Sequence, residues 1–151
     1  MASQYEQLQE NLSERRERKE EAVDVVAALA GLGAEKVADV VSGWMEQAYG
    51  VKASVGLAPK GSRLAVRILD RGEGRMLLAV LGGDASITWA DVDAAEDAAW
   101  GVHADSTIVA SLQAVDLELA KEKEEVRLYG REQLETIYRE IEHEVGGITL
   151  S

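Results

Sequence analysis

The chain has 151 residues, 46% of them hydrophobic, which is enough to bury the core of one domain. Its 28 acidic and 16 basic residues give a formal charge of −12, which disfavours broad contact with nucleic acid or an anionic membrane. Without cysteine, disulfides and thiolate metal sites are excluded, and there is neither a signal peptide nor an apolar run long enough for a membrane helix. We therefore expect a soluble, cytoplasmic protein that does not bind membranes, although such acidity would also suit a salt-adapted proteome.

The first predicted element is a long helix within residues 1–32, which we treat as an arm separate from the domain of residues 33–151. Tyr5, Leu8 and Leu12 recur at helical spacing and so share one face of this helix. A block of mixed charge from residue 14 to residue 21 separates them from the domain. The arm is either an exposed, solvated helix or a docking segment whose apolar patch is covered by a second subunit or another protein.

A second helix is predicted over residues 34–50, because its apolar residues recur at helical spacing and Gly50 suits a left-handed helix end. From residue 51 the apolar residues alternate with polar ones, which predicts strands over residues 51–57 and 64–68. Residues 76–81 form a continuous apolar run that ends in two glycines. This run indicates a central strand covered on both faces, the third strand of an antiparallel meander.

After this strand the pattern becomes helical. Thr88 and Asp91 have the spacing of a weak capping box, and no histidine stands at metal-ligand spacing to the acidic residues that follow, so we predict no metal site there. We further predict strands over residues 106–110 and 126–129, and helices over residues 113–124 and 131–144. We therefore predict an α/β fold with a mixed five-stranded sheet, a three-strand meander followed by two helix-linked strands, flanked by helices.

This order of elements resembles the restriction-endonuclease-like fold, and within it the type IV, Mrr-like branch of the PD-(D/E)xK nuclease superfamily. The resemblance runs from about Ala34 to Tyr138. Residues 86–92 look like the turn into the helix that follows the catalytic strand. Residues 103–111 look like the family's "gad-x-x-ivvt" strand, and residues 120–134 look like its "A-x-x-x-gv-x-lid-g-x-x-L" tail.

The resemblance implies a metal-dependent nuclease site, with an Asp on the second strand and a Glu/Gln-x-Lys on the third. On this sequence the Asp position falls at Arg63 or Leu64, and the other two positions fall at Ala79 and Leu81. None of these side chains can ligate magnesium or replace the lysine. The resemblance therefore implies a degenerate site, with no catalytic residue, metal or cofactor. The acidic residues from which a relocated site would have to be built are Asp70, Glu73 and Asp84.

Two classes of function remain open. The first is a catalytically inactive nuclease-like domain that serves as an assembly or binding module, with homo-oligomerisation or partner docking through the arm. The second is a DNA-processing protein, either a magnesium-dependent nuclease with a relocated site or a DNA-binding remnant that does not cleave. The basic residues that would contact DNA lie on the two predicted hairpins, where surface solvation also explains them; they are Lys60, Arg63, Arg67, Arg71 and Arg75.

Overall fold

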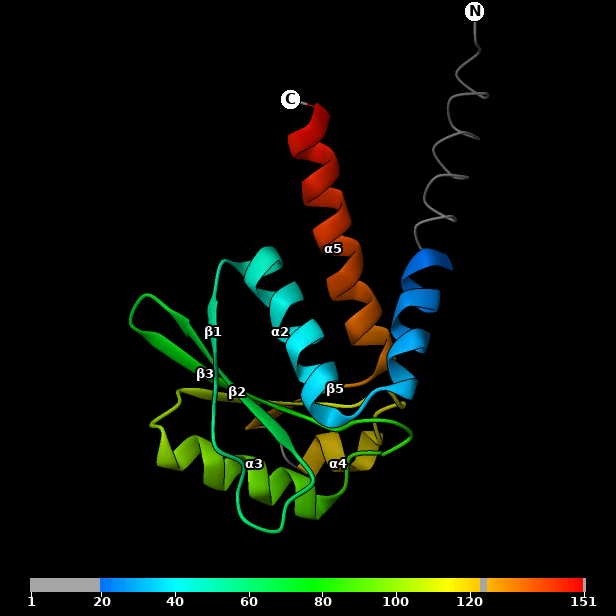
Figure 1. Cartoon of the computed structure of the whole chain (residues 1–151). Coiled ribbons are helices and arrows are strands. Elements are labelled where there is room, and N and C mark those ends of the chain that lie inside the picture. The colour runs from blue at the N-terminus through cyan, green and yellow to red at the C-terminus, as the bar shows by residue number, and fades with distance from the viewer. Residues whose placement is uncertain (1–19, 123–124, 151) are drawn as a thin grey trace, which may run out of the picture.

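The computed structural model describes residues 20–122 and 125–150, and it shows a five-stranded sheet between helices (Figure 1). The strands lie side by side in chain order; they are β1 (Lys52–Val55), β2 (Ala65–Arg71), β3 (Gly74–Val80), β4 (Ser106–Ala110) and β5 (Val126–Tyr129). The first three strands pair antiparallel, and β3, β4 and β5 pair parallel. The predicted α/β class and the mixed five-stranded sheet are confirmed.

The helices cover both faces of this sheet. They are a helix over residues 20–28 that continues into η1 (Leu29–Gly31), followed by α2 (Ala34–Tyr49), α3 (Trp89–Gly101), α4 (Leu117–Glu122) and α5 (Arg131–Leu150). One face of the sheet is covered by α2, α5 and the helix over residues 20–28 (Figure 1). The other face is covered by α3 and α4. Among the described residues, no helix is both long and apolar enough to cross a membrane.

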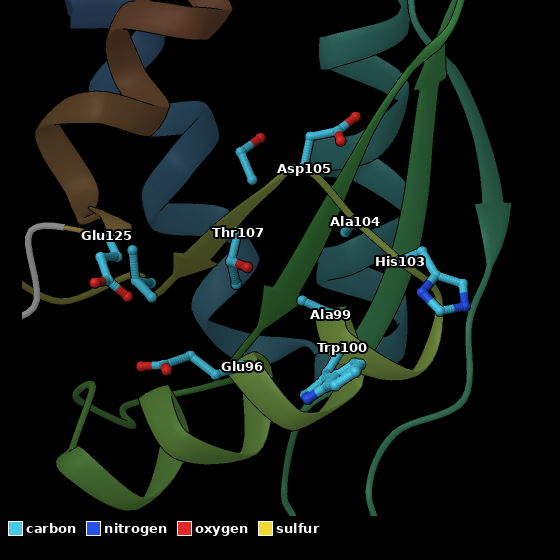
Figure 2. A pocket seen from close by; sticks show the side chains of 10 residues that line it. Glu96, Ala99, Trp100, His103, Ala104, Asp105, Thr107 and Glu125 are labelled. Carbon is cyan, nitrogen blue, oxygen red and sulfur yellow. The ribbon is translucent and has the colours of Figure 1, made fainter.

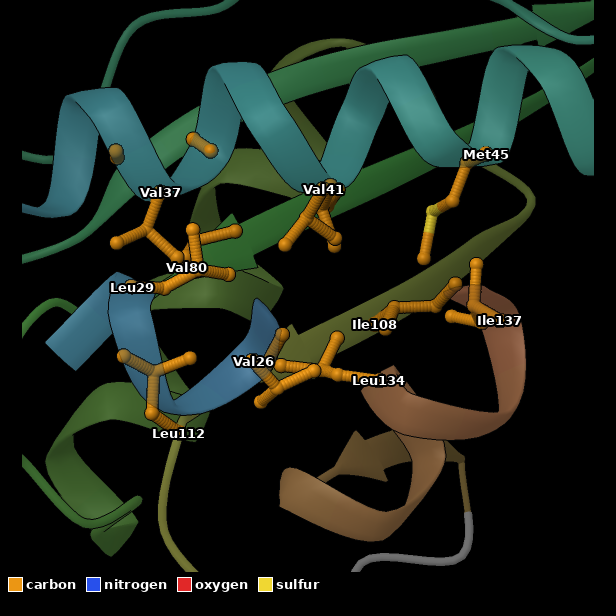
Figure 3. Close-up of a cluster of buried hydrophobic side chains, with 14 of the residues drawn as sticks. Val26, Leu29, Val37, Val41, Met45, Val80, Ile108, Leu112, Leu134 and Ile137 are labelled. Carbon is orange, nitrogen blue, oxygen red and sulfur yellow. The ribbon is translucent and has the colours of Figure 1, made fainter. Parts of the chain in front are cut away.

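One core cluster lies between the sheet and the side of α2 and α5. Met45 from α2 packs with Ile108 from β4 and Leu134 from α5 (Figure 3). Val26 and Leu29 belong to the same cluster and are 0% and 6% exposed. The helix over residues 20–28 and η1, which carry them, close the end of this cluster before α2. The packed part of the chain therefore begins before residue 33. The predicted apolar patch of the arm lies outside the described residues; it consists of Tyr5, Leu8 and Leu12.

The second cluster lies between the sheet and α3 with α4. The strand β3 contributes to both clusters, since Leu78 and Val80 point to one face while Leu77 and Ala79 point to the other. The prediction of a central, doubly covered strand is confirmed. A buried Leu side chain contributes roughly 1.5–3 kcal/mol of hydrophobic free energy, so this strand is a major source of stability.

Two glycines stand where the sequence predicted that an element ends, Gly50 after the second helix and Gly82 after the apolar run. Gly50 ends α2 with a φ of 68°, in the left-handed region that favours glycine. Gly82 follows β3 and lies against the start of α2, where an added Cβ would stand 2.5 Å from the backbone N of Ala34. A larger residue at position 82 would therefore push α2 away from the end of β3.

Two helices differ in length from their predictions. The helix α4 begins at Leu117 because the Asp116 carboxylate accepts a hydrogen bond of 2.9 Å from the Glu118 N–H, as a residue before a helix does. The Gln113 carbonyl instead accepts a hydrogen bond of 3.2 Å from the Arg131 N–H. The helix α5 continues past the predicted end at residue 144, to Leu150.

Candidate functional site

The positions that the resemblance marks for catalysis lie together, where β2 begins and β3 ends. In the antiparallel register Ala65 stands opposite Val80, so Leu64 is a neighbour of Leu81. Leu64, Ala79 and Leu81 are 5%, 0% and 1% exposed, and all three belong to the cluster under α3. Leu81 is also fixed through its backbone, whose N–H donates to the Ala110 carbonyl at 2.9 Å. Buried apolar groups thus occupy this part of the sheet.

Arg63, directly before Leu64, forms an ion pair with Asp91 near the start of α3. Its Nε lies 3.0 Å from Oδ1 and its Nη2 lies 2.8 Å from Oδ2, the two-pronged geometry that suits a guanidinium and a carboxylate. Nη2 also donates to the Ser86 carbonyl at 2.8 Å. The Asp91 side chain is 6% exposed and that of Arg63 is 50% exposed, so the pair covers the edge of the buried leucines.

The Asp91 carboxylate is further saturated by the residue that caps α3. Oδ2 accepts hydrogen bonds from the Thr88 N–H and Oγ1, both at 2.9 Å, and Thr88 Oγ1 accepts one from the Asp91 N–H. The predicted capping box is therefore present. Burial by itself raises the pKa of Asp91, but the hydrogen bonds from Arg63 and Thr88 outweigh it and lower the pKa below its usual value. Asp91 is thus an ionised carboxylate whose two oxygens are already engaged.

A cavity of about 550 Å³ lies beside this ion pair, between the loop that precedes β2 and the first turns of α3. Lys60, Ser62 and Arg63 line it from the loop, and Asp93 and Asp97 line it from the helix. The Ser62 Oγ is buried and has no hydrogen-bond partner within residues 20–122 and 125–150. The cavity therefore offers charges of both signs and one free hydroxyl to a small polar group.

The acids proposed for a relocated metal site do not form a cluster with histidines or with other acids. Asp70 accepts a hydrogen bond of 2.9 Å from the Arg75 Nε, while Glu73 and Asp84 lie in exposed turns. Within the described part of the chain, no three His, Asp or Glu side chains are close enough to hold one metal ion. His103 lies at the end of α3, and the side chain of His143 lies outside the described ones.

The basic residues predicted to contact DNA are distributed over different surroundings. Arg67 is 4% exposed and points toward α2, where its Nη2 lies 2.8 Å from Glu35 Oε2 and 2.9 Å from Asp39 Oδ1. Arg63 and Arg75 are each paired with an aspartate, as described above. Lys60 and Arg71 are exposed. Contact with DNA through this set stays a prediction, and three of its five charges have carboxylate partners.

The meander β1-β2-β3, the parallel strands β4 and β5, and α2 and α3 on opposite faces define a restriction-endonuclease-like fold. A solved structure with this fold is the DNA modification-dependent restriction endonuclease AspBHI, which matches with a TM-score of 0.57 over 88% of this chain at 12% identity. The match covers 40% of that chain, so this chain spans less than half of its length. At this identity the likeness shows a shared fold alone. Neither a family model nor a curated protein matches the sequence.

Proposed function

We propose that this domain is a non-hydrolytic version of the restriction-endonuclease-like fold and acts by binding a partner. The burial of Leu64, Ala79 and Leu81, at the positions where the resemblance requires metal ligands and a lysine, is the observation that supports this proposal. Hydrolysis by a bound magnesium ion needs oxygen ligands, and these side chains carry none. A site of that kind would also need access for water and phosphate, which the closed apolar cluster does not give.

The state of Asp91 supports the same proposal. It is the buried carboxylate nearest to these positions, yet Arg63 and Thr88 occupy both of its oxygens. To bind a metal ion it would have to give up the guanidinium that lowers its pKa and the cap of α3. We infer that Asp91 has a structural role, joining the start of β2 to the start of α3.

A cleavage assay tests the proposal. The purified chain is incubated with supercoiled plasmid in Mg²⁺ or Mn²⁺, using DNA with and without modified bases because the matched endonuclease is modification-dependent. We expect no nicking above the protein-free blank. Metal-dependent cleavage that is lost in Asp70→Asn or Asp84→Asn and retained in the matched variant Glu132→Gln would overturn the proposal in favour of a relocated site.

We propose a second copy of this chain as the partner, held through the apolar face of Tyr5, Leu8 and Leu12. The charge of −12 argues against nucleic acid as the main partner, and an apolar stripe on a helix is stabilised when another helix covers it. The double variant Leu8→Asp with Leu12→Asp should lower the mass measured by light scattering. The variant Gln7→Asp with Asn11→Asp adds the same charge at the same spacing and should leave the mass unchanged. A full-length chain that is already monomeric would exclude this partner.

DNA binding without cleavage is the alternative, and the exposure of Lys60 and Arg71 is the observation in its favour. It predicts a fluorescence anisotropy signal with labelled DNA that falls steeply with salt concentration. The double variant Lys60→Ala with Arg71→Ala should then abolish the signal, while Arg127→Ala, at an exposed position on β5, should retain it. No signal at low salt would rule this alternative out.

A further inference from the structure

The strand β1 forms an outer edge of the sheet, and no described strand lies beyond it (Figure 1). The Gly56 N–H donates to the Val66 carbonyl at 3.0 Å, so the even-numbered residues of this segment turn their backbone groups toward β2. The backbone groups of Ala53 and Val55 therefore turn outward. The Ala53 N–H is covered by the Glu46 carboxylate, to which it donates at 3.3 Å. The edge is thus closed at Ala53 and open at Val55.

Large apolar side chains are exposed along the open part of this edge. Val55 is 74% exposed, and Leu57, in the residues that follow β1, is 92% exposed. Because side chains alternate between the two faces of a strand, Val55 lies on the same face as Ala53, which packs against the cluster between the sheet and α2. Lys52 lies on the opposite face. An edge with open backbone groups and apolar side chains is a template for a further strand.

The charge of this edge is opposite to that of the whole chain. Residues 47–69 contain four basic residues and no acidic one, in a chain whose formal charge is −12. Two of the four, Arg63 and Arg67, are paired with carboxylates. The other two, Lys52 on β1 and Lys60 in the loop that follows it, are exposed. The edge therefore favours a segment that carries carboxylates.

The apolar side chains exposed on α3 and α4 have acidic surroundings instead. Trp100 is 73% exposed at the end of α3. It lines a cavity together with carboxylates and no lysine or arginine; the carboxylates are those of Glu96, Asp105 and Glu125 (Figure 2). Leu117 is 74% exposed and has an acidic residue on each side in the chain. A segment that is both apolar and acidic would be repelled at these positions and attracted at β1.

We propose that the outer edge of β1 binds an extended, acidic segment of a partner protein, which pairs with β1 as an additional strand. The backbone of the segment pairs with the N–H and carbonyl of Val55, and its apolar side chains cover Val55 and Leu57. Its carboxylates approach Lys52 and Lys60. The open backbone groups and apolar side chains favour a peptide over nucleic acid, whose phosphates would engage the lysines alone. This surface goes beyond the association through the arm proposed above and does not depend on it, since the two use different parts of the chain.

Titration of the full chain with a blocked peptide in which valine alternates with glutamate, followed by amide signals in NMR spectra, tests the proposal. We expect saturable shifts at the amides of Val55 and Leu57. The same peptide N-methylated at its valines lacks the N–H groups that would pair with β1, and it should give no saturable shift at these amides. A peptide with lysine in place of glutamate should give none either.

Three outcomes of this titration would overturn the proposal. The first is the absence of saturable shifts with the glutamate peptide. The second is a shift of the same amides when the chain is concentrated without peptide, which would assign the edge to a second copy. The third is an equal shift with a DNA oligonucleotide, which would assign it to nucleic acid.

Two variants weaken the edge in different ways. Val55→Pro removes an outward N–H and keeps those that bond to β2, so it should abolish the shift at Leu57. Lys52→Glu with Lys60→Glu should weaken binding about threefold to tenfold. Binding that either variant leaves unchanged, in a chain whose circular dichroism shows it to be folded, would contradict the proposal.

Two further variants show whether the effect is local. Lys36→Glu with Lys121→Glu makes the same change of charge at exposed positions on α2 and α4, and it should change the affinity less than about twofold. Glu46→Ala uncovers the Ala53 N–H and should tighten binding about threefold, because one more hydrogen bond becomes available to the peptide. Weaker binding by Glu46→Ala would show that the peptide does not pair with this edge.

Discussion

Replacing Leu81 by lysine tests the interpretation that position 81, where the resemblance places the family's catalytic lysine, is part of the core. Leu81 is 1% exposed in the cluster that includes Leu64, Leu77 and Ile87. Loss of the buried leucine costs about 1.5–3 kcal/mol, and burial of an ammonium group adds several kcal/mol, because the lysine must either stay charged without a partner or give up its proton.

We therefore expect Leu81→Lys to lower the free energy of unfolding by about 5 kcal/mol, against roughly 5–15 kcal/mol for a whole domain. For a chain of this length that corresponds to a fall in Tm of at least about 10 °C. The fall is measured by circular dichroism during thermal and urea denaturation. Addition of Ala79→Glu to this variant should not restore cleavage of DNA, because both new side chains would enter the same closed cluster.

The matched control is Leu57→Lys, since Leu57 is 92% exposed in the loop after β1. It should change the free energy of unfolding by no more than about 0.5 kcal/mol. If Leu81→Lys instead kept its Tm within about 2 °C of the parent, the position would be open to solvent and the reasoning about the degenerate site would fail.

Three further predictions concern charges and the arm. The pKa of Asp91 is lowered in the folded state, so ionised Asp91 stabilises the fold. This stabilisation is fully present above the unfolded pKa of about 4 and is lost as the pH falls through the lower folded pKa. Asp91→Asn should remove this part of the pH dependence of stability, measured by urea denaturation at acid pH. Arg67→Ala should lower the free energy of unfolding, measured by urea denaturation, by about 3 kcal/mol. Arg71→Ala, at an exposed position, should lower it by less than about 0.5 kcal/mol, and equal effects of the two variants would contradict the burial of Arg67. Deletion of residues 1–19 should preserve cooperative unfolding and lower the mass in light scattering; an unfolded product would place those residues in the core.

The sheet could be predicted because its elements have strong local patterns. The apolar run of β3, the alternation in β1 and β2, and the capping box at Thr88 and Asp91 each indicate one structure without knowledge of the rest of the chain. The order of these elements was then enough to indicate the fold that the comparison with AspBHI shows. Pattern and topology agreed because few arrangements can bury a doubly covered central strand.

The partners of the charged residues could not be predicted in the same way. Arg67 alternates with apolar residues and so suggested a solvated face, but β2 is covered on both sides and α2 supplies Glu35 and Asp39 to receive the guanidinium. The pairing of Arg63 with Asp91 likewise joins residues that are 28 apart in the chain. The spacing of Thr88 and Asp91 revealed the cap, but no local signal revealed the arginine.

The most direct test of the central claim is whether a metal ion binds where β2 begins and β3 ends. Paramagnetic Mn²⁺ broadens the NMR signals of nearby amides, so a titration reports the amides of Leu64, Ala79 and Leu81 one by one. We expect these signals to stay as sharp as those of Val41 and Met45, buried on the other face of the sheet. Selective broadening of Leu64, Ala79 and Leu81 at low Mn²⁺ concentration would show a metal site in this position and contradict the account.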